Sequence, residues 1–190
     1  MIKATIEDKR LVVEILAASF DDNKSVNYII KQGYNRKERL RRLMEYSFNV
    51  CYRFGEVFLS DEKNACALVV YPDKKKTTLK SILLDAKLII SCVGLKNIKK
   101  TLARESMIKK IQPKGRMSYL WFIGVDPEYQ NEGIGSNLLR EVIRDSGHKK
   151  RPIFLETSTL KNLPWYQKFG FEIYHELNLS YKLFFLKGNE

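Results

Sequence analysis

A short glycine-containing loop is the part of this sequence with the clearest chemical potential. Residues 130–136 read Gln-Asn-Glu-Gly-Ile-Gly-Ser and lie between an apolar stretch and an amphipathic one. Gly133 and Gly135 let the backbone approach a ligand closely, and the N–H groups that open the following helix favour a phosphate. Leu138 fills the third glycine position of the G-x-G-x-x-G dinucleotide pattern, and there is no GKT or GKS phosphate loop. The loop therefore indicates either another kind of pyrophosphate-binding turn or a tight strand-to-helix turn without a ligand.

Other residues that could carry chemistry are few and scattered. His148 and His175 stand apart, with no metal-ligand spacing around them, so we expect no metal site. Trp121 and Trp165 suit either a ligand pocket or core packing. The three cysteines have no C-x-x-C spacing and lie among apolar neighbours, which predicts buried, reduced thiols; they are Cys51, Cys66 and Cys92.

The elements that must position the loop alternate between strand and helix. Residues 117–125 form an apolar run rich in aromatic and β-branched side chains, typical of a central buried strand. Residues 135–146 carry an apolar stripe at helical spacing, and Gly147 suits the end of that helix. We expect further strands at residues 2–6, 56–60, 65–71, 153–157, 171–177 and 179–186, and helices at residues 7–20, 36–54, 78–93, 96–111 and 163–169.

Positive charge is concentrated in the middle of the chain. The 190 residues carry a net charge of +12, and residues 73–114 hold twelve Lys or Arg against three acids. With 44% hydrophobic residues the chain is not disordered, and its length favours one domain, 1–190. We interpret residues 73–114 as a basic helical insertion with lysines outside, although a nucleic-acid or membrane face is the alternative. Its expected buried residues are Leu79, Ile82, Leu83, Leu88 and Ile89.

Two linked motifs resemble the GNAT superfamily of acyl-CoA-dependent N-acetyltransferases. The family pattern Arg/Gln-x-x-Gly-x-Gly/Ala matches Gln130, Gly133 and Gly135, and residues 165–171, Trp-Tyr-Gln-Lys-Phe-Gly-Phe, resemble its C-terminal motif. The resemblance covers a core of about residues 117–171. It implies an α/β (α+β) fold with a mixed, mostly antiparallel twisted sheet flanked by helices, in which the helical insertion precedes the cofactor-binding strand.

The resemblance also implies how acetyl-CoA would bind. Backbone groups of Ile123 and Val125 would bond the pantetheine arm, because in that family the strand leaves its neighbour at a bulge. Asn162, closer to the tyrosine position than the family's asparagine, is the candidate for a further pantetheine contact. The pyrophosphate would lie on the loop, whose residues are Gln130, Asn131, Glu132, Gly133, Ile134, Gly135 and Ser136.

Catalytic roles follow from the same resemblance. Tyr166 matches the tyrosine that faces the CoA sulfur and would protonate the departing thiolate, since a phenol with a pKa of about 10 stays neutral at pH 7. The Val125 amide is a candidate donor to the thioester oxyanion. The acceptor amine must lose a proton, but residues 118–125 hold no carboxylate. Glu156 on the next strand is the nearest candidate base, and a water chain is the alternative.

The predicted activity is transfer of an acetyl group from acetyl-CoA to a primary amine of a small molecule by direct attack. Protein or peptide N-acetylation is one alternative, and a non-catalytic CoA-binding or nucleic-acid-associated module is another. No apolar run could span a bilayer and the first residues lack an apolar signal stretch. We therefore expect a cytoplasmic monomer or homodimer without a specific nucleic-acid partner, and we expect the insertion to lie beside the acceptor side of the cleft.

Overall fold

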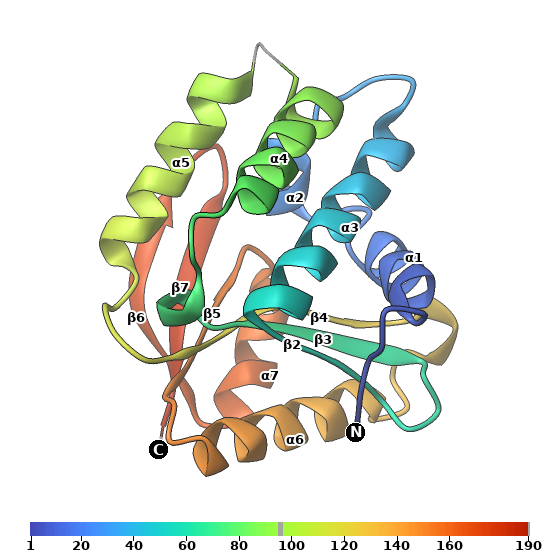
Figure 1. Ribbon diagram of the computed structural model, residues 1–190. Coiled ribbons are helices and arrows are strands. Elements are labelled where there is room, and N and C mark those ends of the chain that lie inside the picture. Colours follow the sequence, from blue (N-terminus) through green and yellow to red (C-terminus); the bar gives the residue numbers. More distant parts are fainter. Residues whose placement is uncertain (95–96, 190) are drawn as a thin grey trace.

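A seven-stranded sheet forms the centre of the computed structural model, which describes residues 1–94 and 97–189 (Figure 1). Its strand order is β1-β2-β3-β4-β5-β7-β6, and every neighbouring pair is antiparallel except β4 and β5, which are parallel. This confirms the mixed, mostly antiparallel sheet. The strands are β1 (Ile2–Lys3), β2 (Gly55–Leu59), β3 (Ala65–Val70), β4 (Ser118–Val125), β5 (Ile153–Thr157), β6 (Phe171–Asn178) and β7 (Lys182–Gly188).

Helices cover both faces of the sheet. In Figure 1, α6 runs along the lower side of the sheet, and α1, α3 and α4 lie above it. None of the helices in the described part of the chain is long and apolar enough to cross a membrane. The helices are α1 (Lys9–Ser19), α2 (Lys24–Ile29), α3 (Arg36–Phe54), α4 (Leu79–Leu88), α5 (Ile98–Ile111), α6 (Ile134–His148) and α7 (Leu163–Lys168), and a π-helical turn (Ile89–Val93) follows α4.

The strand β3 shows how the two faces are filled. All six of its residues are buried, because successive side chains point to opposite faces and both faces are covered. Cys66 and Leu68 belong to the core beneath α1 and α3. Ala67 and Val69 belong to the core formed with α6 and α7. The sheet is therefore held between two helical layers, and the site must open at an edge or where strands separate.

The helix α3 and the strand β5 have their predicted boundaries, whereas several other elements do not. The helix α3 begins and ends at the predicted residues, and Gly55 follows it directly. The prediction misses α2, whose N-cap Asn23 accepts a hydrogen bond from the Val26 amide at 3.1 Å. Gly147 does not end α6; the helix continues to His148, and Lys150, with φ of 51°, takes the left-handed conformation beyond it. The predicted first strand shortens to β1.

The insertion between β3 and β4 consists of α4, the π-helical turn and α5. The predicted helix at 96–111 corresponds to α5, and residue 96 lies outside the described residues. The expected buried face of α4 is wrong, because α1 and α3 already cover that side of the sheet and α4 packs against α3, where Tyr46 donates to Asp85 at 2.6 Å. Of the five residues expected to be buried, Leu88 and Ile89 are partly buried. The exposed residues are Leu79, Ile82 and Leu83, at 82%, 51% and 68%.

Candidate active site

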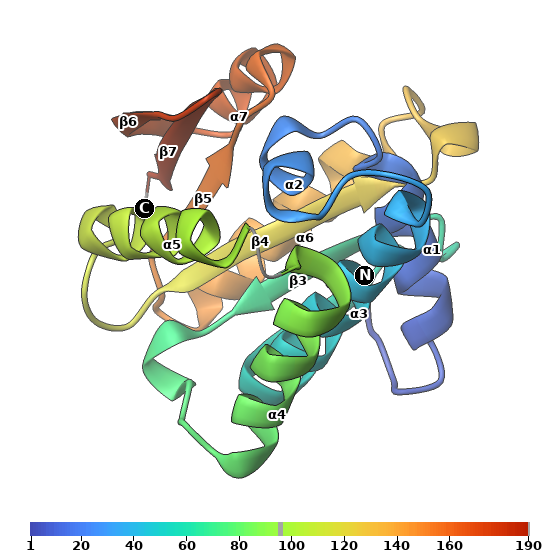
Figure 2. The same ribbon diagram turned by 90° about the horizontal axis from the view of Figure 1, so that it is seen from above.

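The central strands β4 and β5 separate part of the way along the sheet. Their parallel pairing ends at Leu120 and Leu155, whereas β4 continues against β3 as far as Val125. The register with β3 shifts so that Trp121 is an extra residue, which makes a β-bulge at the point of separation. Figure 2 shows β5 turning away from β4 beyond this point. The end of β4 therefore has a sheet neighbour on one side and a gap on the other.

The backbone of Ile123 and Val125 faces this gap. The Asp126 N–H donates to the Asn64 carbonyl at 2.9 Å, which directs the peptide groups of even-numbered residues towards β3. The odd-numbered residues therefore point the other way, and the Val125 carbonyl accepts a hydrogen bond from Gln130 Nε2 at 3.2 Å. The Val125 carbonyl is thus already bonded, and the Val125 N–H is the group that this residue presents to the gap.

The glycine loop at the end of β4 forms an uncapped helix N-terminus. Asn131 and Gly133 have φ of 70° and 82°, the left-handed region that favours glycine. Gly133 is the N-cap of α6, so no side chain covers the first N–H groups of the helix. A Cβ atom at Gly135 would lie 3.0 Å from Val125 Cγ2, which explains the second glycine. The amides of Ile134, Gly135 and Ser136 and the positive end of the helix dipole are therefore open to an anion, as a pyrophosphate would require.

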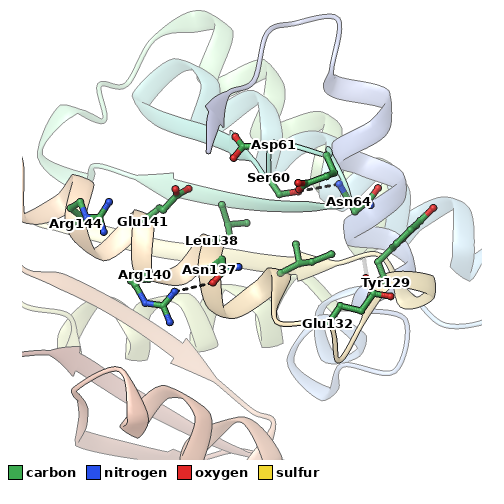
Figure 3. Close-up of a pocket in the computed structure, with 12 residues that line it drawn as sticks. Ser60, Asp61, Asn64, Tyr129, Glu132, Asn137, Leu138, Arg140, Glu141 and Arg144 are labelled. Atoms are coloured by element: carbon green, nitrogen blue, oxygen red, sulfur yellow. Dashed lines mark hydrogen bonds between the residues drawn. The ribbon is translucent and has the colours of Figure 1, made fainter.

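A polar groove of about 560 Å³ lies on the outer side of the loop, between α6 and the turn that joins β2 to β3 (Figure 3). The side chains of Glu132 and Ile134 line this groove, so only their backbone is available to the gap between β4 and β5. The groove is lined by more acidic than basic side chains, so it would repel the negative charge of a pyrophosphate. The acids are Asp61, Glu62, Glu132 and Glu141, and the bases are Arg140 and Arg144. We therefore do not assign this groove to the cofactor.

A second cavity, of about 330 Å³, opens on the side of β4 and β5 that faces the insertion. It lies between α2, α3 and α5 and reaches α7 at its far end. A cavity of this size with an apolar lining and a few polar groups is typical of a small-molecule site. Its apolar lining includes Phe20, Leu43, Tyr46, Val50, Trp121 and Phe122.

Glu156 lines this cavity as the first residue of β5 beyond the last pair with β4. Burial raises the pKa of its carboxyl to about 7, although bonds from Tyr119 and Gln112 and the charge of Arg104 act in the opposite direction. The Gln112 bond runs from Nε2 to Glu156 Oε1 at 3.1 Å. A carboxylate with a pKa near the working pH is well suited to accept a proton from an amine.

Tyr166 lines the same cavity from α7. Its side chain is 6% exposed, and burial raises the pKa of its hydroxyl above the ordinary value of 10, so the phenol keeps its proton at neutral pH. The neighbouring Trp165 donates from Nε1 to Ser136 Oγ at 2.9 Å, which fixes α7 against the start of α6. Asn162, the N-cap residue of α7, also lines the cavity.

The structure thus gathers part of the predicted site into one cavity. Glu156, Tyr166, Asn162 and Ile123 line it together, whereas the loop at 130–136 lies just beyond it at the end of β4. The described residues contain no group of three or more His, Cys, Asp or Glu placed to hold a metal ion.

The sequence did not predict Arg104 of α5 and its C-cap residue Gln112 as cavity residues. The insertion does flank the cavity, mainly through this helix, and of the predicted apolar face only Leu88, at the end of α4, lines the cavity. Arg104, Ile108 and Gln112 recur every four residues, which places them on one face of a helix. Polar residues on the face of a helix that otherwise points inward are the sequence pattern from which these two cavity residues could have been predicted.

Comparisons with known proteins agree with this geometry. Residues 82–173 match the family model of the acetyltransferase (GNAT) domain. The fold is similar to a histone acetyltransferase HPA2 and related acetyltransferase from Corynebacterium glutamicum, with 18% identity, a TM-score of 0.70, and coverage of 100% of this chain and 95% of that one. It is also similar to the C-terminal condensation domain of Ebony in complex with β-alanyl-dopamine, with 11% identity, a TM-score of 0.69, and coverage of 98% and 96%.

A third similar structure is the NatC complex bound to Gag peptide and CoA, with 14% identity, a TM-score of 0.56, and coverage of 100% of this chain and 96% of that one. The family match spans the bulged strand, the loop and α7. Residues 82–173 thus form an acetyltransferase domain of the GNAT superfamily, and the fold of the whole chain agrees with that assignment.

Proposed function

We propose that this enzyme transfers an acetyl group from acetyl-CoA to a primary amine of a small molecule bound in the 330 Å³ cavity. The observation that carries the proposal is that Glu156 and Tyr166 line one cavity at the place where β4 and β5 separate. A proton acceptor and a proton donor then face the same cavity, which an acetyl thioester would enter where the two strands separate. The co-substrate supplies the activated acetyl group.

The chain's own residues account for each proton. Glu156 accepts the proton that the amine must lose as its nitrogen attacks the thioester carbonyl. The Val125 N–H donates to the carbonyl oxygen as negative charge develops on it. Tyr166 gives its proton to the sulfur as the carbon–sulfur bond breaks and the carbon–nitrogen bond forms. The products are an amide and the free thiol, and exchange with water restores both side chains.

A small acceptor is favoured over a protein by the shape of the site. The insertion helix α5 and the helices α2 and α3 enclose the cavity, and its volume of about 330 Å³ lies at the lower end of the range for small-molecule sites. Among the similar structures, one holds β-alanyl-dopamine and another a peptide with CoA. A peptide acceptor is therefore the second candidate. A cytoplasmic monomer or homodimer remains the prediction from the sequence.

The test is acetyl-CoA turnover against a panel of small amines and peptides, read as free thiol and confirmed by the mass of the acetylated product. Acetyl-CoA should raise the melting temperature, because a ligand that binds the native state stabilises it. Acetylation of peptides alone would favour the second candidate. A rise in melting temperature without turnover of any amine would indicate a non-catalytic CoA-binding module.

A further inference from the structure

One wall of the cavity is polar, and it is made by a single face of α5. Thr101, Arg104, Glu105 and Ile108 of α5 and its C-cap residue Gln112 all line the cavity, and all of them except Glu105 follow one another at intervals of three or four residues. The opposite walls, from α3 and β4, are mainly apolar. A ligand in this cavity would therefore lie with its polar end towards α5 and towards Glu156.

Arg104 is the central charge of this wall. Its side chain is 7% exposed. Nε donates to the Tyr181 hydroxyl at 2.8 Å, Nη2 donates to Ser25 Oγ at 2.6 Å, and Nη1 donates to Glu105. These bonds to described residues use three of the five N–H donors of a guanidinium. Donors therefore remain on both terminal nitrogens for a ligand in the cavity.

The charges around Arg104 are not balanced. The cations that line the cavity are Lys75, Arg104 and Lys109, and the acids are Glu105 and Glu156. The Glu105 side chain is 44% exposed, and Glu156, with its pKa raised to about 7, is only partly ionised at neutral pH. Burying a cation without a buried counter-charge is unfavourable, so this cavity favours a ligand that brings an anionic group.

A second observation at the same wall points to a missing partner. Among the described residues, Thr101 Oγ1 is buried without a hydrogen-bond partner. Thr101 also lines the cavity, one turn before Arg104 on the same face of α5. Buried polar atoms in native proteins are nearly always bonded, so this hydroxyl is poised to donate to a bound group.

We propose that Arg104, assisted by Thr101, binds a carboxylate on the acceptor, so that the substrate is an amino-acid-like amine that carries its own carboxylate. The inference rests on the proposed acetyl transfer and names its substrate class. The amine faces Glu156, the carboxylate faces α5, and the aromatic lining receives an apolar or aromatic body. Arg104 and Glu156 are close enough to interact electrostatically, so the amine and the carboxylate of the ligand must also be separated by only a few bonds. A guanidinium matches a carboxylate in a two-bond geometry that a single ammonium does not provide.

The experiment compares matched acceptors: free phenylalanine and leucine, their primary carboxamides, and the corresponding amines without the carboxyl carbon. We expect the wild type to use the free acids with a kcat/KM about ten- to a hundredfold above the carboxamides, the range for a hydrogen bond to a charged group. In Arg104→Met that preference should fall to within about threefold, mainly through KM. Tyr181→Phe is the matched control, because it removes one bond to Arg104 but keeps the charge, and it should keep the preference.

Equal use of acids and carboxamides by the wild type would overturn the carboxylate assignment. An Arg104→Met variant that weakens every acceptor alike would make Arg104 a structural tether of α5. If that variant does not fold, Thr101→Val tests the same face of α5 and should lower the preference for free acids over carboxamides several-fold. An unchanged preference in Thr101→Val would contradict the proposed carboxylate site. Binding of acetyl-CoA without turnover of any acceptor would instead refute the proposed function, and this inference with it.

Discussion

Replacing Glu156 with Gln should stabilise the protein at alkaline pH. The carboxyl has a pKa of about 7 in the folded protein against an ordinary value of 4.5, so folding tightens its hold on the proton. The stability contributed by that proton is fully present below about pH 4.5 and is lost as the pH rises through 7. One pKa unit corresponds to about 1.4 kcal/mol. Ionisation of Glu156 therefore lowers the free energy of unfolding by up to about 3 kcal/mol above pH 8.

The Gln side chain cannot ionise and keeps an oxygen that accepts the bond from Gln112. We expect Glu156→Gln to match the wild type within about 0.5 kcal/mol at pH 4.5 and to exceed it by up to about 3 kcal/mol at pH 8.5, measured by urea unfolding. Glu7→Gln, the same chemical change at an exposed position, should show no such gain. Equal stability of the Glu156 variant and the wild type at pH 8.5 would refute a raised pKa.

The same variant should lose activity. Wild-type turnover should rise with pH through about 7, because the base must be ionised to accept a proton. Glu156→Gln should lower kcat by about 10²–10⁴-fold and remove that step from the rate profile. If Glu156→Gln kept the kcat of the wild type, the proton of the amine would have to leave through a water chain instead.

Three further substitutions test the remaining assignments. Tyr166→Phe should lower kcat by up to about 10²–10⁴-fold and leave the Kd for acetyl-CoA, measured by calorimetry, nearly unchanged; an unaltered kcat would remove its hydroxyl from the mechanism. Gly133→Val forces a β-branched residue to φ of 82° and should abolish the rise in melting temperature with acetyl-CoA, whereas Gly115→Val, at φ of 107° in a distant loop, should strain the backbone and leave that rise intact. Gln112→Leu removes a bond that lowers the pKa of Glu156, so the rate profile should shift to higher pH, and an unmoved profile would show that Gln112 does not act on the base.

The backbone of the glycine loop could be predicted because its determinants are local. The loop at 130–136 is one continuous stretch, and its glycines adopt the backbone that a close approach requires or fill a position where a Cβ would crowd Val125. The long helix α3 was equally accessible, since its apolar stripe repeats over five turns before Gly55. Six residues, as in α2, are too few to show a helical period.

The acceptor side of the site could not be predicted from local sequence. Gln112 reaches Glu156 across 44 residues of sequence, and nothing local indicates that they meet. Apolar composition alone placed α4 in the core, but the core on that face was already filled by α1 and α3, and Leu79 remains 82% exposed. The burial of an inserted helix is decided by what the rest of the fold leaves uncovered.

The insertion and the proposed base depend on each other physically. Glu156 is the first residue of β5 past the separation from β4, so without a cover its carboxylate would meet water and keep an ordinary pKa near 4.5. The helix α5 supplies the cover: Ile108 packs with Leu183 and Phe185 of β7, and Gln112 bonds the carboxylate. Burial beneath this helix raises the pKa towards the pH at which a base accepts a proton from an amine. A chain with the same glycine loop and a different insertion would therefore bind the same cofactor but differ both in its acceptor and in the pH at which its base works.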